Sequence, residues 1–310
     1  MKPLVLLTQA FLPEVLAQEL APFAEIKIAN DRTTLNKLIP RAQGLLTSFS
    51  DPIDEALLKR AVKLKVIANV AVGINNIDLQ ACAKRRIRVC NTPEVLTRAT
   101  AECALTLLLA CARRLPEGER LCRKGQFKGW KIDLLLGLEL KGRRAVLVGP
   151  GRIGKETAKL FRAIGIKVKW IKRGDSENEI RAKLSEAQII SLHCPLTSET
   201  HHWLNARRLS CLPFDAIVIN TTRGACIEER ALISALKKRK IFSAGLDVFE
   251  FEPKIPKALI ALPNVVLLPH LGSATLQTRQ AMVRLAARGV VGVLSGKPPP
   301  NEVKFRHGNE

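Results

Sequence analysis

The sequence contains no tyrosine, only two methionines and 4% aromatic residues among its 310 positions. So few aromatic side chains leave little for stacking against nucleic-acid bases. No apolar run approaches the roughly 18–20 residues that a membrane helix needs, and Pro13 and Glu14 interrupt the apolar N-terminal stretch before it could act as a signal peptide. We therefore expect no membrane partner; the missing tyrosine has no functional explanation.

The eight cysteines lack the spacing of a metal site. None forms a CxxC pair, and only Cys194 has a histidine beside it, His193. Several cysteines lie on apolar faces, as small buried side chains do. The pattern predicts no structural metal, and it favours reduced thiols in a cytoplasmic protein.

Acidic residues are scarce relative to basic ones, with 28 Asp and Glu against 50 Lys and Arg, which gives a formal charge of +22. Such a charge attracts polyanions. The basic residues are nevertheless spread along the whole chain, and no nucleic-acid-binding motif is present. We therefore do not expect nucleic acid as a partner, although a regulatory protein associated with nucleic acid remains an alternative.

Short apolar runs alternate with amphipathic stretches, the pattern of parallel strands joined by helical crossovers. A first series of strands is expected at 4–8, 25–29, 44–47, 66–70 and 88–91. A second series is expected at 144–148, 167–171, 188–193, 216–221, 243–248 and 265–268. Between the series a long helix should run from Thr97 to a point before Pro116, and a last helix should cover about 281–294. The fold class is therefore α/β, with two doubly wound parallel-sheet domains.

A glycine-rich turn follows the strand at 144–148 and opens a helical stretch. It reads Gly149-Pro-Gly151-Arg152-Ile153-Gly154. In this context the glycines allow a tight turn, a close approach of the backbone to a pyrophosphate, and close packing of helix on strand. The helix N-terminus then offers N–H donors to the phosphates. We predict a dinucleotide-binding loop.

The end of the next strand distinguishes the two nicotinamide cofactors. An NAD site usually has a carboxylate there for the ribose hydroxyl, whereas a 2′-phosphate requires cations. The sequence has Lys172 and Arg173 at this point, and Asp175 lies beyond the turn. NADP(H) is therefore the preferred cofactor, and NAD(H) is the alternative.

Seven ordered motifs across nearly the whole chain resemble the D-isomer-specific 2-hydroxyacid dehydrogenases. They are NVAVGINNID (69–78), NTPEVLT (91–97), GPGRIG (149–154), HCPLT (193–197), NTTRG (220–224), AGLDVF (244–249) and PHLGSAT (269–275). Within that family the chain looks most like the glyoxylate/hydroxypyruvate reductases. The resemblance implies a Rossmann cofactor domain, residues 99–280, inserted into a flavodoxin-like substrate domain formed by residues 1–98 and 281–310. It also implies an active site in the cleft between domains, and a homodimer.

Reduction of a 2-keto acid requires a cation for the substrate oxygens and a proton donor for the developing alkoxide. Arg223 follows an apolar strand, and its guanidinium could grip two oxygens. His270, beyond the last strand, is the candidate acid, and Glu252 would hold its imidazole by a hydrogen bond. The family resemblance assigns the same three roles to these residues, which form the predicted catalytic triad.

The remaining site residues come from the resemblance and from the phosphate loop. The cofactor is expected to contact Gly149, Gly151, Arg152, Ile153, Gly154, Lys172, Arg173, His193, Cys194, Pro195, Thr222 and Asp247. The substrate is expected to contact Ser48, Phe49, Val72, Gly73, Arg223 and His270. A small polar side chain beside an aromatic ring fits a small 2-keto acid.

The sequence thus predicts an oxidoreductase that transfers a hydride between NADP(H) and a small 2-keto or 2-hydroxy acid, with glyoxylate or hydroxypyruvate reduction leading. Phosphoglycerate, formate and phosphite dehydrogenases share the scaffold and remain alternatives. A dinucleotide-sensing regulatory protein of this fold is a further alternative.

Overall fold

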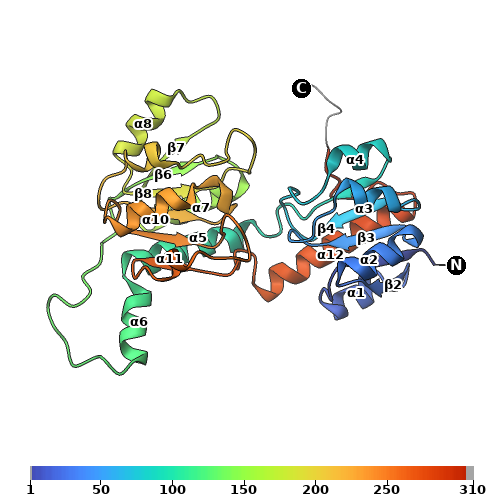
Figure 1. The fold of residues 1–310 in the computed structure, drawn as a ribbon, viewed down its shortest axis with the longest axis horizontal. Helices are drawn as coiled ribbons and strands as arrows, with labels where there is room; N and C mark the ends of the chain where they lie inside the picture. Colours follow the sequence, from blue (N-terminus) through green and yellow to red (C-terminus); the bar gives the residue numbers. More distant parts are fainter. Residues whose placement is uncertain (1, 305–310) are drawn as a thin grey trace. The chain divides into compact units, whose positions relative to one another are not determined.

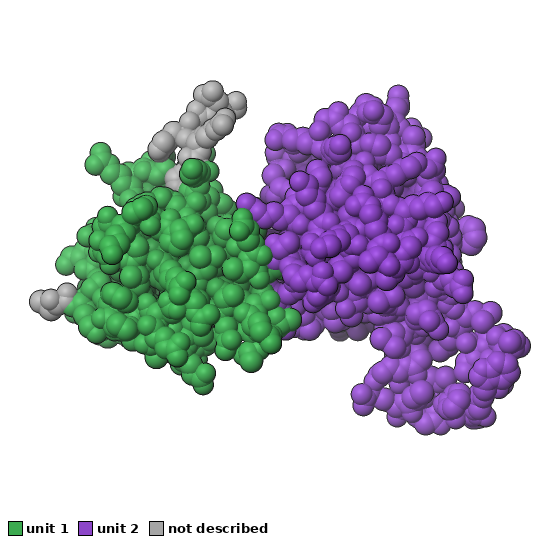
Figure 2. All heavy atoms as spheres, turned by 180° about the vertical axis from the view of Figure 1, so that it is seen from behind, with its two compact units in different colours: residues 1–96, 275–310 green, residues 97–274 purple. Residues whose placement is uncertain are grey.

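The computed structural model describes residues 2–304. Within this range the chain forms two compact units, one of residues 2–96 with 275–304 and one of residues 97–274 (Figure 2). We call them unit 1 and unit 2. No helix among the described residues is long and apolar enough to span a membrane.

Unit 1 is built on a five-stranded parallel sheet in the order β2-β1-β3-β4-β5 (Figure 1). The strands are β1 Leu4–Leu7, β2 Glu25–Ile28, β3 Gly44–Thr47, β4 Val66–Asn69 and β5 Arg88–Cys90. Its helices are α1 Pro13–Glu19, α2 Arg32–Leu38, α3 Glu55–Arg60, α4 Leu79–Lys84 and α12 Leu276–Leu294, with a short 3-10 helix η1 Ile39–Arg41. The strand order is that of a flavodoxin-like sheet.

The local sequence explains these elements. Strands β1, β3 and β4 are buried at every position, which suits a parallel sheet covered by helices on both faces. Helices α2, α3 and α4 begin at Asp31, Asp54 and Asp78, and each aspartate accepts a backbone N–H of its own first turn. Because the strands are parallel, the loops after β3 and β4 emerge at the same edge of the sheet.

Unit 2 contains a six-stranded parallel sheet in the order β11-β10-β9-β8-β6-β7. The strands are β6 Arg144–Val148, β7 Lys167–Ile171, β8 Ile189–Leu192, β9 Ile217–Asn220, β10 Ser243–Leu246 and β11 Val265–Leu267. The helices are α5 Thr97–Ala112, α6 Leu115–Arg123, α7 Arg152–Ala163, α8 Glu177–Ser185, α9 Ala206–Leu209, α10 Glu229–Lys237 and α11 Lys257–Ile260, with a 3-10 turn η2 Gly224–Cys226. All strands of both units lie within two residues of the expected bounds, and the α/β class with two parallel sheets is confirmed.

Two helices differ from the sequence expectation. Arg114 takes a left-handed conformation (φ 51°) that ends α5, and α6 then starts at Leu115 with Pro116 in its first turn, where a proline is tolerated. The expected helix near 281 begins instead at Leu276, because the Thr275 hydroxyl accepts the Thr278 N–H at 3.2 Å. Helix α12 therefore lies wholly in unit 1, where it packs on β3, β4 and β5.

Candidate active site

The glycine-rich loop joins β6 to α7, as a phosphate-binding loop must. Gly149 has φ 94°, and a Cβ there would lie 2.9 Å from the Cys194 backbone nitrogen. A Cβ at Gly154 would lie 2.4 Å from the Gly149 carbonyl oxygen. Gly151 is the N-cap of α7, and the space beside its Cα is open. The loop thus leaves room for a ligand at a twelve-residue helix N-terminus, where phosphates bind.

The end of β7 presents cations. The strand ends at Ile171, so Lys172 and Arg173 are the next residues. Asp175 turns back to accept the Lys172 backbone N–H at 3.0 Å and to contact the Lys183 ammonium at 2.5 Å. The hydrogen bond from Lys183, followed by that from the Lys172 N–H, lowers the pKa of Asp175. The Asp175 carboxylate is therefore ionised and already paired with Lys183 of α8.

Two buried polar atoms at the carboxyl ends of the strands of unit 2 lack a hydrogen-bond partner within residues 2–304. They are His193 Nδ1, just after β8, and Thr221 Oγ1, just after β9. The other ring nitrogen of His193 lies 2.8 Å from the Ser191 hydroxyl, and burial lowers the pKa of His193 to about 3, so the ring is neutral. Since buried polar groups normally have partners, these atoms fit a polar ligand at this sheet edge. A nicotinamide dinucleotide, with its phosphates and hydroxyls, matches this requirement.

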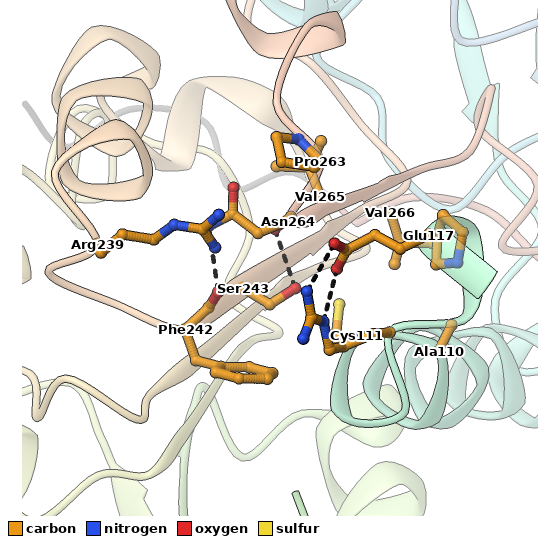
Figure 3. A pocket seen from close by; sticks show the side chains of 12 residues that line it. Ala110, Cys111, Glu117, Arg239, Phe242, Ser243, Pro263, Asn264, Val265 and Val266 are labelled. Atoms are coloured by element: carbon orange, nitrogen blue, oxygen red, sulfur yellow. Dashed lines mark hydrogen bonds and ion pairs between the residues drawn. The ribbon is translucent and has the colours of Figure 1, made fainter. Parts of the chain in front are cut away.

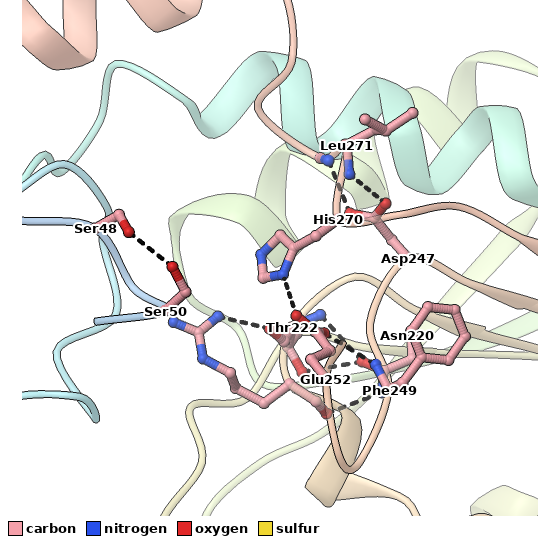
Figure 4. A network of polar contacts seen from close by, with 11 residues as sticks. Ser48, Ser50, Asn220, Thr222, Asp247, Phe249, Glu252, His270 and Leu271 are labelled. Carbon is pink, nitrogen blue, oxygen red and sulfur yellow. Dashed lines mark hydrogen bonds and ion pairs between the residues drawn. The ribbon is translucent and has the colours of Figure 1, made fainter. Parts of the chain in front are cut away.

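His270 and Glu252 form a hydrogen-bonded pair after β11 and β10. His270 Nδ1 lies 2.9 Å from Glu252 Oε2 (Figure 4), and the other carboxylate oxygen accepts the Phe249 N–H at 3.0 Å. Burial acts to raise the pKa of Glu252, but the His270 and Phe249 hydrogen bonds and the charges of His270 and Arg223 outweigh it, so the pKa is lowered. Glu252 is therefore an anion that orients the imidazole through Nδ1.

Asp247 holds the backbone on which His270 stands. This carboxylate is 1% exposed, and its two oxygens accept the N–H groups of Leu271 at 2.6 Å and Gly272 at 2.7 Å. Its carbonyl oxygen accepts the His270 N–H at 2.9 Å. Burial raises the pKa of Asp247, and the two backbone donors oppose that effect. These contacts fix His270 in a left-handed conformation with φ 58°.

Arg223 follows β9 and is largely buried. Its guanidinium donates to the Thr222 carbonyl at 2.7 Å, and burial lowers its pKa while the Glu252 charge opposes that shift. Asn220 Nδ2 donates to the Arg223 carbonyl at 2.9 Å, and Asn220 Oδ1 accepts the Thr222 N–H at 3.0 Å. Asn220 thus shapes the turn that carries Arg223, a role that sequence reasoning missed although the residue lies in the NTTRG motif.

In unit 1 the four residues predicted to contact the substrate lie on the loops after β3 and β4. Ser48 donates its hydroxyl to Asp51 at 2.8 Å, and its hydroxyl also lies 2.8 Å from that of Ser50 (Figure 4). Asn76 joins the two loops, because its amide donates to the Ser48 and Asp51 carbonyls at 2.9 and 3.0 Å. Sequence reasoning did not identify this link, since it connects residues 28 positions apart.

The predicted site residues of unit 2 lie at the carboxyl ends of its strands. They follow β6 (Gly149, Gly151, Arg152, Ile153, Gly154), β7 (Lys172, Arg173), β8 (His193, Cys194, Pro195), β9 (Thr222, Arg223), β10 (Asp247, Glu252) and β11 (His270). Ligands of open parallel sheets bind at that edge. The predicted catalytic and cofactor residues of unit 2 therefore lie at the edge of the sheet where a ligand is expected to bind.

A pocket of unit 2 lies elsewhere (Figure 3). It is bounded by the starts of β10 and β11, at Ser243 and Val265, and by Cys111 and Glu117 of α5 and α6. Ser243 and Val265 lie at the amino ends of β10 and β11. The pocket is therefore separate from the candidate active site.

Comparison with known proteins gives a consistent result. Residues 105–272 match the family model "D-isomer specific 2-hydroxyacid dehydrogenase, NAD binding domain". A glyoxylate reductase from Thermococcus litoralis is 42% identical, with 98% of this chain and 97% of that protein covered. A protein from Thermus thermophilus has a similar structure, with TM-score 0.92, 41% identity and coverage of 97% and 100%.

A second solved structure is that of an NADPH-dependent glyoxylate/hydroxypyruvate reductase from Sinorhizobium meliloti, in complex with NADP and malonate. Its TM-score is 0.89 at 32% identity, and both chains are covered completely. The family predicted from the motifs is confirmed, as is a nicotinamide dinucleotide as cofactor. The chain is an oxidoreductase and belongs to the D-isomer specific 2-hydroxyacid dehydrogenase family.

Proposed function

We propose that the protein is an NADPH-dependent reductase of small 2-keto acids, with glyoxylate and hydroxypyruvate as the leading substrates. The observation that carries this proposal is the His270–Glu252 pair at 2.9 Å, with the Arg223 charge acting on the same carboxylate. The names of the Thermococcus and Sinorhizobium relatives support the substrate class.

In this proposal His270 is the acid of the reduction. Its Nδ1 is held by Glu252, so Nε2 is the atom that gives a proton to the developing alkoxide and takes one in the reverse direction. Arg223 binds the keto acid through its guanidinium, which matches two oxygens in one plane. The nicotinamide cofactor, when bound, supplies or accepts the hydride.

The domain roles follow from the same placement. We assign cofactor binding to residues 97–274, and substrate recognition to the loops of unit 1. The backbone at Val72 and Gly73 would bind the substrate carboxylate, and Ser48 and Phe49 would limit its size. Their position after neighbouring parallel strands supports a shared role.

The preference for NADPH rests on Lys172 and Arg173. Lys172 is the first residue after β7, where an NAD site usually has a carboxylate. Arg173 forms an exposed ion pair with Glu199 at 2.8 Å, which a 2′-phosphate could displace because such pairs are weak. The Sinorhizobium relative, whose structure was solved in complex with NADP, supports this assignment.

We also propose a homodimer in the cytoplasm. The segment from α6 to residue 138 extends from the sheet of unit 2 (Figure 1), and five of its large apolar side chains are more than half exposed. These are Leu115, Phe127, Trp130, Ile132 and Leu136. Apolar surface of this extent is typical of protein interfaces. The eight cysteines are free thiols, as in a reducing compartment.

The test is a spectrophotometric panel of NADPH and NADH against glyoxylate, hydroxypyruvate, pyruvate, phosphohydroxypyruvate and oxaloacetate. We expect the highest kcat/KM with NADPH and either glyoxylate or hydroxypyruvate. A clear preference for phosphohydroxypyruvate would assign the chain to a phosphoglycerate-type branch instead. Turnover of none of these acids would overturn the proposal.

A further inference from the structure

Three potential metal ligands meet outside the predicted catalytic residues. His201 and His202 lie in the loop between β8 and α9, and Glu250 lies in the loop after β10; their ligand atoms are all within 4.8 Å of one another. The imidazoles stack with ring centroids 4.0 Å apart, and His202 Nε2 lies 2.7 Å from Glu250 Oε1. Two imidazole nitrogens and one carboxylate oxygen form a His₂Glu donor set, which zinc accepts with a fourth position left for water.

Two of the three ligands are held in place by the backbone. His202 has φ 50°, an uncommon conformation for a residue with a side chain, and its N–H donates to the Ala225 carbonyl at 2.7 Å. Glu250 Oε2 accepts the Glu229 N–H at 3.3 Å, and the Glu250 N–H donates to Glu229 Oε1 at 3.4 Å. Such outer contacts orient metal ligands, while exposed His201 is free to turn its ring toward them.

The local charge suits a cation although the whole chain is basic. Glu229 is 6% exposed, and its carboxylate hydrogen-bonds to the backbone of Glu250. A divalent ion bound at Glu250 would therefore lie near a second carboxyl group. Positive charges more than about 8 Å away matter less, because salt screens exposed charges over that distance at physiological ionic strength.

We propose that His201, His202 and Glu250 bind one divalent transition-metal ion, Zn²⁺ in particular. Zinc–nitrogen bonds of about 2.0–2.1 Å place tetrahedral ligands about 3.3 Å apart, so the short His202–Glu250 contact must open slightly. Any proton on the coordinating imidazole nitrogens is released on binding. The ion would tie the loop after β8 to the loop after β10, and it takes no part in hydride transfer.

The experiment uses the full chain freed of metal with EDTA and then titrated with Zn²⁺ or Co²⁺. We expect one Zn²⁺ per chain by calorimetry and a Tm that rises with Zn²⁺ concentration. Co²⁺ should give visible bands without the intense near-ultraviolet band of thiolate ligation. This readout separates the proposed site from the cysteines.

Two variants each replace one proposed metal ligand with a side chain of similar size. His201→Gln and Glu250→Gln should each weaken Zn²⁺ binding by about tenfold or more. His201→Gln should leave turnover in metal-free buffer unchanged, because this exposed residue is outside the predicted catalytic triad. Cys122→Ser, which removes an exposed thiol, is the control and should bind Zn²⁺ as the wild type does. Absence of Zn²⁺ binding, a thiolate band, or wild-type affinity in His201→Gln would overturn the proposal.

Discussion

The imidazole of His270 is held at Nδ1 by Glu252 at 2.9 Å, and its backbone N–H is held by the Asp247 carbonyl, also at 2.9 Å. Ring and main chain are thus fixed by different residues of the same loop after β10. The proposed proton donor is therefore positioned before any substrate arrives, which lowers the cost of organising the transition state.

Replacing His270 with alanine removes the proposed acid. We expect kcat to fall by about 10²–10⁴, the usual contribution of a positioned acid or base. NADPH binding, followed by fluorescence, should persist, because the phosphate loop lies on other strands. The control is His201→Gln, which should keep wild-type kcat; unchanged turnover in His270→Ala would refute the assignment.

Glu252→Gln tests the orienting role of the carboxylate. Glutamine keeps the shape and can still accept the Phe249 N–H, but it removes the negative charge beside His270. The protonated ring should therefore lose a stabilising neighbour, so kcat of the reduction should fall while NADPH binding is retained. Wild-type kcat in Glu252→Gln would show that Glu252 does not act through His270.

The features that the sequence predicted arise from local patterns, whereas several of those that it missed arise from contacts between segments distant in the sequence. Most strands were predictable because they are short buried apolar runs, and the candidate acid follows the last of them within three residues. Strands β2 and β7, at the edges of their sheets, are partly exposed and mix charged with apolar residues. Helix α6 was missed because Pro116 predicts the end of a helix, whereas the left-handed turn at Arg114 allows a new helix to start there. Asn76 and the His202–Glu250 contact depend on which loops the topology brings together, and no local pattern encodes that.

Lys172→Asp tests the cofactor preference. The change replaces a cation with an anion at the end of β7, so a 2′-phosphate would be repelled and a ribose hydroxyl accepted. We expect the NADPH/NADH ratio of kcat/KM to fall by about 10–100-fold, the equivalent of one charge-assisted hydrogen bond. Lys167→Asp, at the other end of β7, is the matched control and should leave the ratio unchanged. Equal use of both nucleotides by the wild type would defeat the prediction.

The buried neutral ring of His193 predicts loss of stability in acid. Its pKa is about 3 in the folded protein, below the usual 6.5, because burial disfavours the charged form. As the pH falls below 6.5 the unfolded chain binds a proton that the folded chain does not, so folding loses about 1.4 kcal/mol per pH unit from this group. Between pH 7 and 5 the free energy of unfolding should fall by about 2 kcal/mol more in the wild type than in His193→Asn.

Urea denaturation at the two pH values measures this difference. His201→Asn, which changes an exposed histidine of the same loop, should keep the wild-type dependence. An equal pH dependence in His193→Asn and the wild type would mean that the His193 ring is charged, or reaches water, in the folded protein.

The exposed apolar segment after α6 predicts self-association. Trp130 and Ile132 are 78% and 77% exposed, and burying each against a second copy would contribute roughly 1.5–3 kcal/mol. Light scattering on a sizing column should show the wild type as a dimer, and the double variant Trp130→Ser/Ile132→Ser should dissociate at least partly at micromolar concentration. Phe214→Ser changes an equally exposed aromatic residue at 80% on another part of unit 2 and should remain dimeric. If the wild type is a monomer, or if the double variant dimerises as tightly as the wild type, this segment is not the interface.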